Sequence, residues 1–591
     1  MKRIFTLVCL TLVAQFTSIN NADATIYTVV QSGPWSDSNT WQGMNRPPWT
    51  ITAGNEVIIT GPFNVILDSS VTFTGVGSKL ELNAGAKILP GIDPTYFSFN
   101  GGELLGDGSI DVDSVYANFS TGGGFGFTGT LFANNFVYAA LTSSQLVTLD
   151  IRKSLILRTT VDLGPGTLEI ENGCTIYCEG GSIPLVSPSQ INLFQPYHVV
   201  YRNAATTTGK ELTGINILDI EVASGLGNTV TLSTQLKIQT TLKLTSGTLD
   251  LNGNSLIFEP FGKLSAGGAG DIASTSGASI RVNANSGLDD ALRFSTTANT
   301  IDSLVINCSG TGAKVKIAGD VNVNVICQLQ AGMVELNDAT LFITTGALLS
   351  GGDNANHFST LGKGKLAQHV APNQTRVYPV GTGTEYAPAS VKGNPNNTQG
   401  MVLVSAREEV LSNGTYGYNI DDKQPMVKHT WTISSAITAT LDLDIELFWH
   451  ASQEINSFDR SKCYIAKNST GTWDDLTPSG ATTQNGMFRQ VRAGLSSLSE
   501  FAVFDQNTAL SVQELNKQNN ISIYPNPAHN VLHIDGKADG YATIYSITGQ
   551  AIVTTNITKG DNSIDISHLP AGNYQVKIDT DETTTHRFTK Q

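Results

Sequence analysis

Short runs of alternating apolar and polar residues recur through the first 370 positions and are separated by glycine and asparagine. One such run occurs four times, with starts that are 88, 81 and 85 residues apart: Leu80-Glu81-Leu82-Asn83, Leu168-Glu169-Ile170-Glu171, Leu249-Asp250-Leu251-Asn252 and Val334-Glu335-Leu336-Asn337. A period of two places one side of each strand in a core, and glycine and asparagine tolerate the positive φ angles of tight turns. The pattern predicts an all-β body, a right-handed parallel β-helix over residues 25–370 with four repeats of about 85 residues.

A stack of rungs needs covered ends. Trp35, Trp41 and Trp49 stand just before the first predicted rung. Bulky aromatic side chains cover the open end of a solenoid, so we expect these three to pack as a cap. The alternative is a row of exposed platforms for sugar rings.

The pattern changes near residue 371, and the strands that follow are better separated. Residues 371–507 have the strand spacing of an immunoglobulin-like β-sandwich, without the Cys-Trp-Cys pattern of that fold. The clearest strand is 441–449, whose alternation directs one set of side chains inward: Leu441, Leu443, Ile445, Leu447 and Trp449.

Asp442, Asp444 and Glu446 then share the outer side of that strand. Neighbours on one side of a strand are about 6.6 Å apart, near the lower end of the carboxyl separation of an inverting glycosidase. Catalysis also needs one carboxyl with a raised pKa in a desolvated cleft, whereas acids on an exposed strand discourage edge pairing. A solvated face is the interpretation we favour, and a calcium site or a catalytic pair are the alternatives.

The net charge of the chain bears on which kinds of molecule it can bind. The chain has 591 residues, of which 14% are charged, and 35 Lys and Arg against 50 Asp and Glu give a net charge of −15. So acidic a chain has no electrostatic footprint for nucleic acid or anionic membranes. We therefore expect no nucleic-acid partner.

The N-terminus has the three parts of a secretory signal. Met1-Lys2-Arg3 precedes the apolar run 4–13, and Ala22-Asp23-Ala24 is a small-x-small cleavage sequence. We expect residues 1–24 to be removed between Ala24 and Thr25. No later stretch approaches the roughly 18 to 20 apolar residues that a membrane helix requires, so no transmembrane segment is expected.

Five cysteines follow the predicted cleavage point: Cys174, Cys178, Cys308, Cys327 and Cys463. An odd number leaves at least one unpaired. Cys174 and Cys178 would lie roughly 13 Å apart in an extended strand, beyond disulfide reach. Buried single thiols are the favoured interpretation, but the disulfide state is left open.

The search for catalytic chemistry gives no site. The chain has no nucleophile elbow, no HExxH, no P-loop and no EF-hand loop. Asp107, Asp111 and Asp113 lie near a turn without the ligand spacing of a calcium loop, so a turn is favoured. We expect no cofactor, with calcium as the one ion left open.

Two groups of basic residues deserve a test in the structure. His357, His369 and Arg376 fall near the end of the predicted solenoid, where surface positions are expected. The solenoid also carries few arginines, and a uronate lyase needs basic groups. Such an enzyme would be favoured if Arg152, Arg158 and Arg202 lay together with acidic residues along one lateral groove.

Two short stretches carry family resemblances. Trp35-Ser36-Asp37-Ser38-Asn39-Thr40-Trp41, with the strands that end at Leu67-Asp68, resembles the eight-glycine (G8-like) solenoid openings of extracellular proteins. The segment 376–381, followed by Tyr386-Ala387-Pro388, resembles a boundary found in secreted Bacteroidetes surface proteins. The first resemblance implies a β-solenoid but no single activity.

The strongest resemblance lies after a polar linker at 508–520. Residues 521–591 resemble the type A C-terminal sorting domain of the type IX secretion system, with four motifs in order: Ile521 to Pro527, Ala542 to Gln550, Ile564 to Ile578 and Arg587 to Lys590. The resemblance assigns recognition or folding roles to Tyr524, Pro525, Asn526, Pro527, Gly549, Leu569, Gly572 and Tyr574.

The resemblance implies a Bacteroidetes source and export across the outer membrane. The implied partners are the type IX machinery and its sortase, and the implied fates are release or attachment to surface lipopolysaccharide. The expected function is a non-enzymatic surface or secreted protein of adhesin or structural type with a glycan or protein ligand. The alternative is an extracellular β-helix enzyme that degrades polysaccharides, a lyase or glycoside hydrolase. The ligand, the anchoring mode and the oligomeric state are left open.

Overall fold

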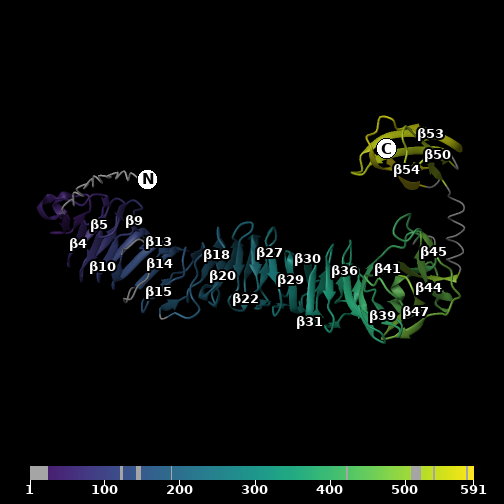
Figure 1. Cartoon of the computed structure of the whole chain (residues 1–591), viewed down its shortest axis with the longest axis horizontal. Helices are drawn as coiled ribbons and strands as arrows, with labels where there is room; N and C mark the ends of the chain where they lie inside the picture. Colours follow the sequence, from purple (N-terminus) through teal and green to yellow (C-terminus); the bar gives the residue numbers. More distant parts are fainter. Residues whose placement is uncertain are drawn as a thin grey trace, which may run out of the picture. The chain divides into compact units, whose positions relative to one another are not determined.

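The computed structural model describes residues 24–119, 124–140, 148–187, 189–420, 424–506, 521–536, 539–580 and 583–591. The fold is all-β, with a β-solenoid of about 14 turns followed by C-terminal β-sheets (Figure 1). Contacts divide the chain into two units, 1–233 and 234–591. Each unit is described by itself.

The first unit is a three-sided solenoid whose strands pair in parallel from rung to rung. The first side holds β1 (Ile26–Thr28), β4 (Glu56–Ile59), β7 (Lys79–Leu82), β10 (Glu103–Gly106) and β12 (Phe125–Phe127). The second holds β2 (Gly33–Pro34), β5 (Asn64–Leu67), β8 (Lys87–Pro90), β15 (Thr167–Ile170), β17 (Gln190–Asn192) and the first halves of three longer strands. Those long strands are β11 (Ser109–Asn118), β13 (Thr130–Ala140) and β14 (Thr148–Leu157).

The third side contains both short strands and parts of the long ones. It holds β3 (Thr50–Ile51), β6 (Val71–Thr74), β9 (Tyr96–Asn100), the second halves of β11, β13 and β14, and then β16 (Cys174–Cys178), β18 (Tyr197–Arg202) and β20 (Ile217–Ala223). The long strands bend between their halves, because β14 pairs with β15 through 148–151 and with β16 through 154–157.

Aromatic side chains fill the N-terminal end of this solenoid. Trp35 and Trp41 are fully buried with ring centroids 5.1 Å apart, and Trp35 lies 6.2 Å from Phe97. Phe73 and Phe99 continue the cluster. Trp35 and Trp41 therefore pack as the expected cap and are not exposed sugar platforms, whereas the third expected member, Trp49, is only half-buried, with the Arg46 guanidinium over its ring.

The second unit opens with further parallel rungs. Strands on two of its sides are β22 (Leu236–Ile238), β25 (Ser255–Phe258), β28 (Ser279–Val282) and β34 (Leu348–Gly351), and β24 (Thr248–Asp250) with β27 (Asp271–Ser274). The long strands β29 (Leu292–Asn307) and β31 (Val321–Ala331) join sides. Asn252 and Asn337, which end two copies of the sequence repeat, adopt the positive φ expected there, 47° and 48°.

The last rung passes directly into two antiparallel sheets. β36 (Lys365–Val370) pairs in parallel with β33 (Thr340–Ile343) and antiparallel with β40 (Gly400–Arg407). The first sheet continues through β41 (Met426–Ser435), β48 (Glu500–Asp505) and β44 (Cys463–Ser469). The other has the order β37 (Thr375–Tyr378), β39 (Ala389–Gly393), β42 (Leu443–Trp449), β47 (Met487–Leu495) and β46 (Thr482–Gln484).

Two details of the strand at 441–449 differ from the expectation. The strand begins at Leu443, and Leu441 is half-buried before it, although Leu443, Ile445, Leu447 and Trp449 are buried as expected. β42 is also an internal strand with β39 and β47 on its two sides. Asp442, Asp444 and Glu446 therefore do not serve to prevent pairing at a sheet edge.

The last part of the chain forms a small sandwich. One sheet contains β49 (Ser522–Tyr524), β50 (Val531–Gly536) and β53 (Gly560–Asp565). The other has the order β52 (Ala551–Ile557), β51 (Gly540–Ser546), β54 (Gly572–Asp579) and β55 (Thr583–Lys590). Alternating residues of both sheets form one apolar core, which includes Leu532, Ile544, Val576 and Phe588.

Candidate functional site

The C-terminal sandwich is closed by its first and last segments. The Asn526 side-chain amide donates to the Arg587 carbonyl at 3.1 Å, and its oxygen accepts from the Thr589 N–H at 2.9 Å. Two residues further on, the Ala528 N–H donates to the Thr589 carbonyl, and the Ala528 carbonyl accepts from the Gln591 N–H. Asn526 therefore fastens the final strand to the start of the domain.

The other predicted sorting residues divide into interior and surface positions. Leu569 and Tyr574 belong to the core, and the Tyr574 hydroxyl donates to the Pro570 carbonyl at 2.8 Å. Tyr524 is 43% exposed and stacks on His533, with ring centroids 5.3 Å apart. Pro525 and Pro527 are exposed beside it.

The two glycines differ. Gly549 has a φ of +83°, which disfavours any side chain, while a Cβ on Gly572 would meet only the Tyr574 ring at 3.9 Å. Leu569, Tyr574 and Asn526 thus support folding of the domain, whereas Tyr524 lies where a partner can touch it. The structure brings Tyr524 to Pro527 together with the last strand, and it places Gly549 on a separate turn.

At the other end of the chain, Ala24 is exposed and Thr25 is tied into the first rung. The Thr25 N–H donates to the Asn55 side-chain oxygen at 3.0 Å, and its carbonyl accepts from the Glu56 N–H at 3.0 Å. Residues 1–23 of the predicted signal lie outside the described residues. No helix in the described part of the chain is long and apolar enough to cross a membrane.

The third side of the first solenoid unit presents ordered columns of side chains. In-register pairing aligns five outward-facing residues, one from each of β11, β13, β14, β16 and β18: Tyr116, Val137, Ile156, Tyr177 and Val200. All five are half-buried against their neighbours. We call them the apolar column.

A second column runs beside the first, two residues earlier on each strand. It consists of Ser114, Asn135, Ser154, Thr175, His198 and Asp219, and we call it the polar column. Its members bond to one another: Asn135 to Ser114 at 3.3 Å, Ser154 to Asn135 at 2.8 Å and His198 to Asp219 at 2.8 Å. The column thus holds two short runs of hydrogen bonds, Ser114 to Ser154 and His198 to Asp219, rather than a set of converging catalytic groups.

Two arginines and one carboxylate border the apolar column on its other side. The Nε atoms of Arg158 and Arg202 donate to the two oxygens of Glu179, at 3.1 and 2.9 Å. The Arg158 guanidinium lies 5.7 Å from the Tyr116 ring centroid, and that of Arg202 lies 3.7 Å from the Tyr177 centroid. Burial opposes ionisation of Glu179, but the hydrogen bonds from both arginines outweigh it and lower its pKa.

Arg152 is placed differently. Both of its terminal nitrogens bond to Asp111, at 2.9 and 3.2 Å, at the bend between the second and third sides. Arg158 and Arg202 therefore do cluster with an acid on one side of the solenoid, and Arg152 forms a separate pair. The sequence signal for this arrangement is spacing, because Arg158 and Glu179 directly follow strand ends, Arg202 is the last residue of β18, and the three are 21 and 23 residues apart.

One acid that the sequence analysis missed lies inside this unit. Glu211 is fully buried, and its carboxylate accepts from Tyr201 Oη at 2.7 Å, the Gly209 N–H at 2.7 Å and the Ile183 N–H at 2.9 Å. Burial raises its pKa, and the hydrogen bonds offset part of that rise. These contacts hold a loop against the solenoid interior, and nothing in the local sequence marks Glu211 as buried.

The cysteines are also interior. All five that follow the predicted cleavage point are free and buried. Burial raises the pKa of the Cys174 thiol to about 12. Such thiols do not ionise at neutral pH and are inert.

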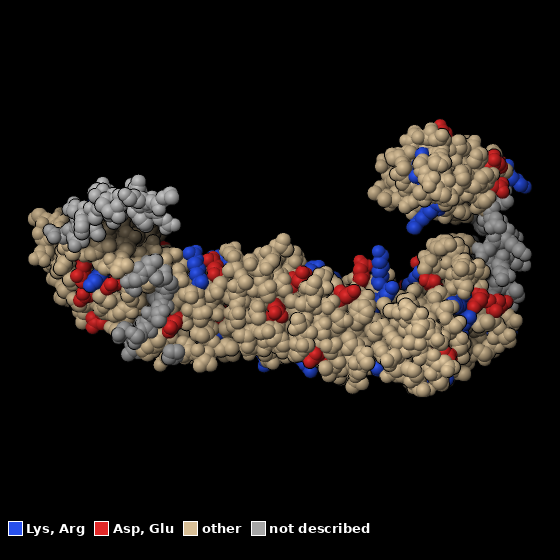
Figure 2. Space-filling view, in the orientation of Figure 1, with Lys and Arg blue, Asp and Glu red and all other residues tan. Residues whose placement is uncertain are grey.

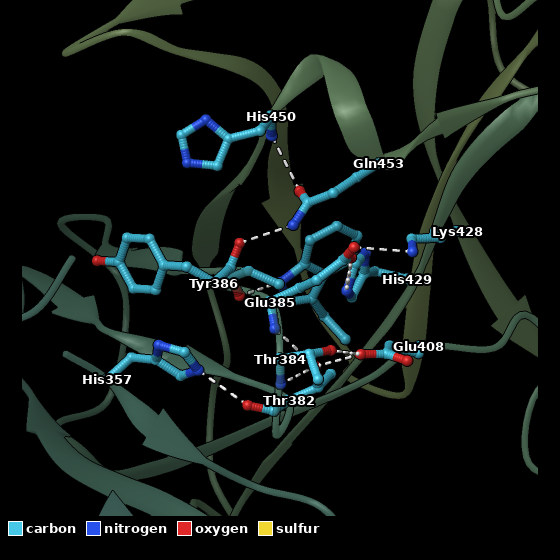
Figure 3. A network of polar contacts seen from close by, with 12 residues as sticks. His357, Thr382, Thr384, Glu385, Tyr386, Glu408, Lys428, His429, His450 and Gln453 are labelled. Atoms are coloured by element: carbon cyan, nitrogen blue, oxygen red, sulfur yellow. Dashed lines mark hydrogen bonds and ion pairs between the residues drawn. The ribbon is translucent and has the colours of Figure 1, made fainter. Parts of the chain in front are cut away.

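A network of ionisable side chains lies where the solenoid meets the antiparallel sheets (Figure 3). Glu385 reaches between Lys428 Nζ, at 2.8 Å, and the buried His429 Nε2, at 3.4 Å. Burial lowers the pKa of His429 to about 4, so the ring is neutral at pH 7. Glu408 accepts from the Thr382 and Thr384 hydroxyls, whose hydrogen bonds lower its pKa.

His357 belongs to this junction as well. The ring is fully buried and Nε2 lies 2.8 Å from the Thr382 carbonyl. The expectation of a surface position is therefore wrong for His357, because the chain returns 25 residues later to cover it. These contacts fasten the loop 382–387 to the last rung, so the network stabilises the fold at this junction.

The other acidic candidates are engaged in pairs. Glu446 accepts from Arg489 at 2.9 Å, and Asp444 accepts from Asn394 at 2.8 Å. Asp113 accepts from Asn134 at 3.0 Å. Among the residues with assigned positions, no group of three or more His, Cys, Asp or Glu side chains could hold a metal ion.

Comparison with known proteins identifies one region. Residues 522–591 match the family of secretion system C-terminal sorting domains. The searches against curated proteins and against solved structures give no significant match. Residues 522–591 are thus a type IX sorting domain that engages the type IX secretion machinery, and the chain that carries it is exported to the cell surface or secreted.

Proposed function

We propose that this exported chain is a non-enzymatic protein of adhesin or structural type, whose solenoid presents one side to a glycan or protein ligand. The observation that carries the proposal is the pair of unbroken columns on the third side of the first unit. A repeating surface suits a repeating or extended ligand, and five of the six residues in the polar column are bonded to a neighbour in it instead of converging on one reacting atom.

The charge distribution supports the same proposal. On the face that Figure 2 shows, acidic and basic side chains are sparse and dispersed. The strongest ionic contacts are closed pairs, such as Arg152 with Asp111 and Arg492 with Asp474. Catalysis by paired carboxylates requires two acids whose environments hold their pKa values apart around one cleft.

The proposal includes the division of the chain. Residues 1–24 form a signal peptide that is cut between Ala24 and Thr25, and residues 25–370 form the presenting solenoid with a G8-like opening. Residues 371–507 form an immunoglobulin-like sandwich, 508–520 a linker and 521–591 the sorting domain. A sortase removes the sorting domain, and the body is then released or joined to surface lipopolysaccharide of a Bacteroidetes cell.

A polysaccharide-degrading enzyme is the second candidate, because Arg158 and Arg202 do share Glu179 on one side of the solenoid. The test uses the purified chain from Thr25 to Gln591 and a panel of plant, algal and bacterial polysaccharides. We expect binding without new reducing ends and without the absorbance of unsaturated products. Product from any glycan would replace the proposal with the second candidate.

A further inference from the structure

We propose that the third side of the first unit binds an extended acidic polysaccharide, with its sugar rings along the apolar column and its oxyanion substituents on Arg158 and Arg202. This inference rests on the proposed function and names the class of ligand and the place. Three features support it: the repeat of the column, its two polar borders and the terminal arginine nitrogens that do not bond to Glu179.

The repeat matches that of a sugar chain. Neighbouring strands in a sheet are about 4.8 Å apart, which is close to the length of one sugar ring in an extended polysaccharide. Five successive apolar side chains from Tyr116 to Val200 therefore offer one contact for each ring. The column ends at Glu221, which follows Val200 in the register on β20.

The borders match the chemistry of a sugar ring, whose faces carry C–H groups and whose rim carries hydroxyls. The polar column supplies hydroxyl, amide and imidazole groups along one edge of the apolar column. A ring that packs on Ile156 or Tyr177 thus has hydrogen-bonding partners within reach on Ser154 or Thr175. Ligand sites generally combine an apolar floor with a few placed polar groups.

The arginines indicate an acidic ligand rather than a neutral one. Arg158 and Arg202 each bond to Glu179 through Nε, so their terminal nitrogens are not occupied by that carboxylate, although the Arg158 guanidinium also meets Tyr116 and that of Arg202 stacks on Tyr177. Two parallel N–H groups at the end of a guanidinium match the two oxygens of a carboxylate or sulfate. In Arg152, by contrast, both terminal nitrogens donate hydrogen bonds to Asp111.

The outward charge at this border is positive. The side chains of Arg158 and Arg202 are 45% and 33% exposed, whereas that of Glu179 is 14% exposed beneath them. Glu179 and the two tyrosine rings hold the guanidiniums in place, so little side-chain freedom is lost on binding. Two other ionisable side chains on this side, His198 and Asp219, pair with each other, and the carboxylate of Glu221 lies at the end of the apolar column on β20.

The experiment measures binding of the chain from Thr25 to Gln591 by isothermal titration calorimetry. The probes are polygalacturonate for carboxylates, dextran sulfate for sulfates, and fully methyl-esterified polygalacturonate, which keeps the backbone without the charge. We expect at least one acidic probe to bind at least tenfold more tightly than the esterified one, and added salt to weaken that binding. The preferred probe tells carboxylate from sulfate.

The variants locate the site. The double substitution Arg158→Gln with Arg202→Gln is expected to weaken acidic binding tenfold or more, and Arg158→Lys to weaken it in part because a point charge replaces the fork. The matched control is Arg281→Gln, which removes an exposed arginine from β28 in the other unit and leaves binding unchanged. The unfolding temperature of each variant is measured alongside.

The outcomes separate this inference from the proposed function. Unchanged acidic binding in the double variant, equal affinity for esterified and acidic chains, or no acidic binding at all overturns the inference and leaves a non-enzymatic surface protein standing. Release of product overturns the proposed function, and the inference then holds only if the double variant raises KM. If the double variant does not fold, the test is the comparison of acidic and esterified polygalacturonate on the unsubstituted chain, and equal affinities overturn the inference.

Discussion

The solenoid and the sorting domain are both all-β, but they close in opposite ways. In the solenoid, bonded residues of successive rungs are close in sequence, for example 19 positions apart for Ser154 with Asn135 and 23 for Arg202 with Glu179, and each strand depends on its neighbours. In the sorting domain, Asn526 bonds to residues 61 and 63 positions away, at the very end of the chain. A defect should therefore stay local in the first and spread through the whole of the second.

The largest effect tests the local character of the solenoid. Phe97→Ala removes a ring that contacts Trp35, Phe73 and Phe99, and we expect it to cost about 3–5 kcal/mol. Hydrogen exchange read by mass spectrometry should show loss of protection in β6, β9 and β11 but not in β18. Tyr96→Ala, at a side chain that is 48% exposed, is the control. Loss of protection throughout the solenoid would contradict the comparison.

The second effect concerns the buried carboxylate. Glu211→Gln keeps an acceptor for Tyr201 but turns an amide toward the Ile183 N–H, so we expect a loss of about 1–3 kcal/mol around β18. Chemical unfolding followed by hydrogen exchange in β16 to β20 measures it. An equal loss in Lys210→Gln, the neighbouring residue, would show that the loop and not the carboxylate is responsible.

The same residue predicts a pH dependence. The pKa of Glu211 is higher in the folded chain than its ordinary value of 4.5, so the folded state binds this proton more tightly. Its contribution to stability is then fully present below that ordinary value and is lost as the pH rises through the raised pKa. Unfolding midpoints of the parent and of Glu211→Gln, compared from pH 4 upward, should converge as the pH rises. A constant difference would contradict the prediction.

The third effect tests closure of the sorting domain. Asn526→Ala removes two hydrogen bonds to β55, and we expect it to lower the free energy of unfolding by about 1 kcal/mol and to reduce export. The control is Asn556→Ala, at an exposed position on β52. Export is measured as the fraction of chain outside the cell, and equal values for the two variants would remove the closing role from Asn526.

The smallest effect on stability belongs to Tyr524. Its side chain is 43% exposed and contacts chiefly His533, so Tyr524→Ala should change the free energy of unfolding by less than about 0.5 kcal/mol. If export still falls, the ring is read by the secretion machinery. If export is unchanged, Tyr524 is neither a folding nor a recognition residue.

The sequence was sufficient for features that depend on local periodicity. Alternation correctly assigned the inward side of 443–449. The repeated motif predicted the solenoid, and four different motifs in order predicted the sorting domain. Alternation defines which side of a strand faces the core but not which strands lie beside it. For this reason alternation could not show that β42 is an internal strand, with β39 and β47 beside it.

Features that depend on distant partners could not be predicted. Glu211 is buried because Tyr201, Gly209 and Ile183 converge on it, and His357 is buried because the loop at Thr382 covers it. The local sequence around an ionisable residue does not show which distant residues will bury it. The border formed by Arg158, Glu179 and Arg202 was closer to predictable, since its spacing equals the rung length.

The in-register columns also bear on how such a protein changes over generations. Duplication of one whole rung would lengthen both columns by one step and leave every existing contact type in place. The gene could therefore vary the reach of its surface by copying a segment of about 20 residues, whereas the same insertion in the sorting domain would separate Asn526 from the strand it fastens. Length should be the freely evolving trait of the body, and the tail should stay constant in size.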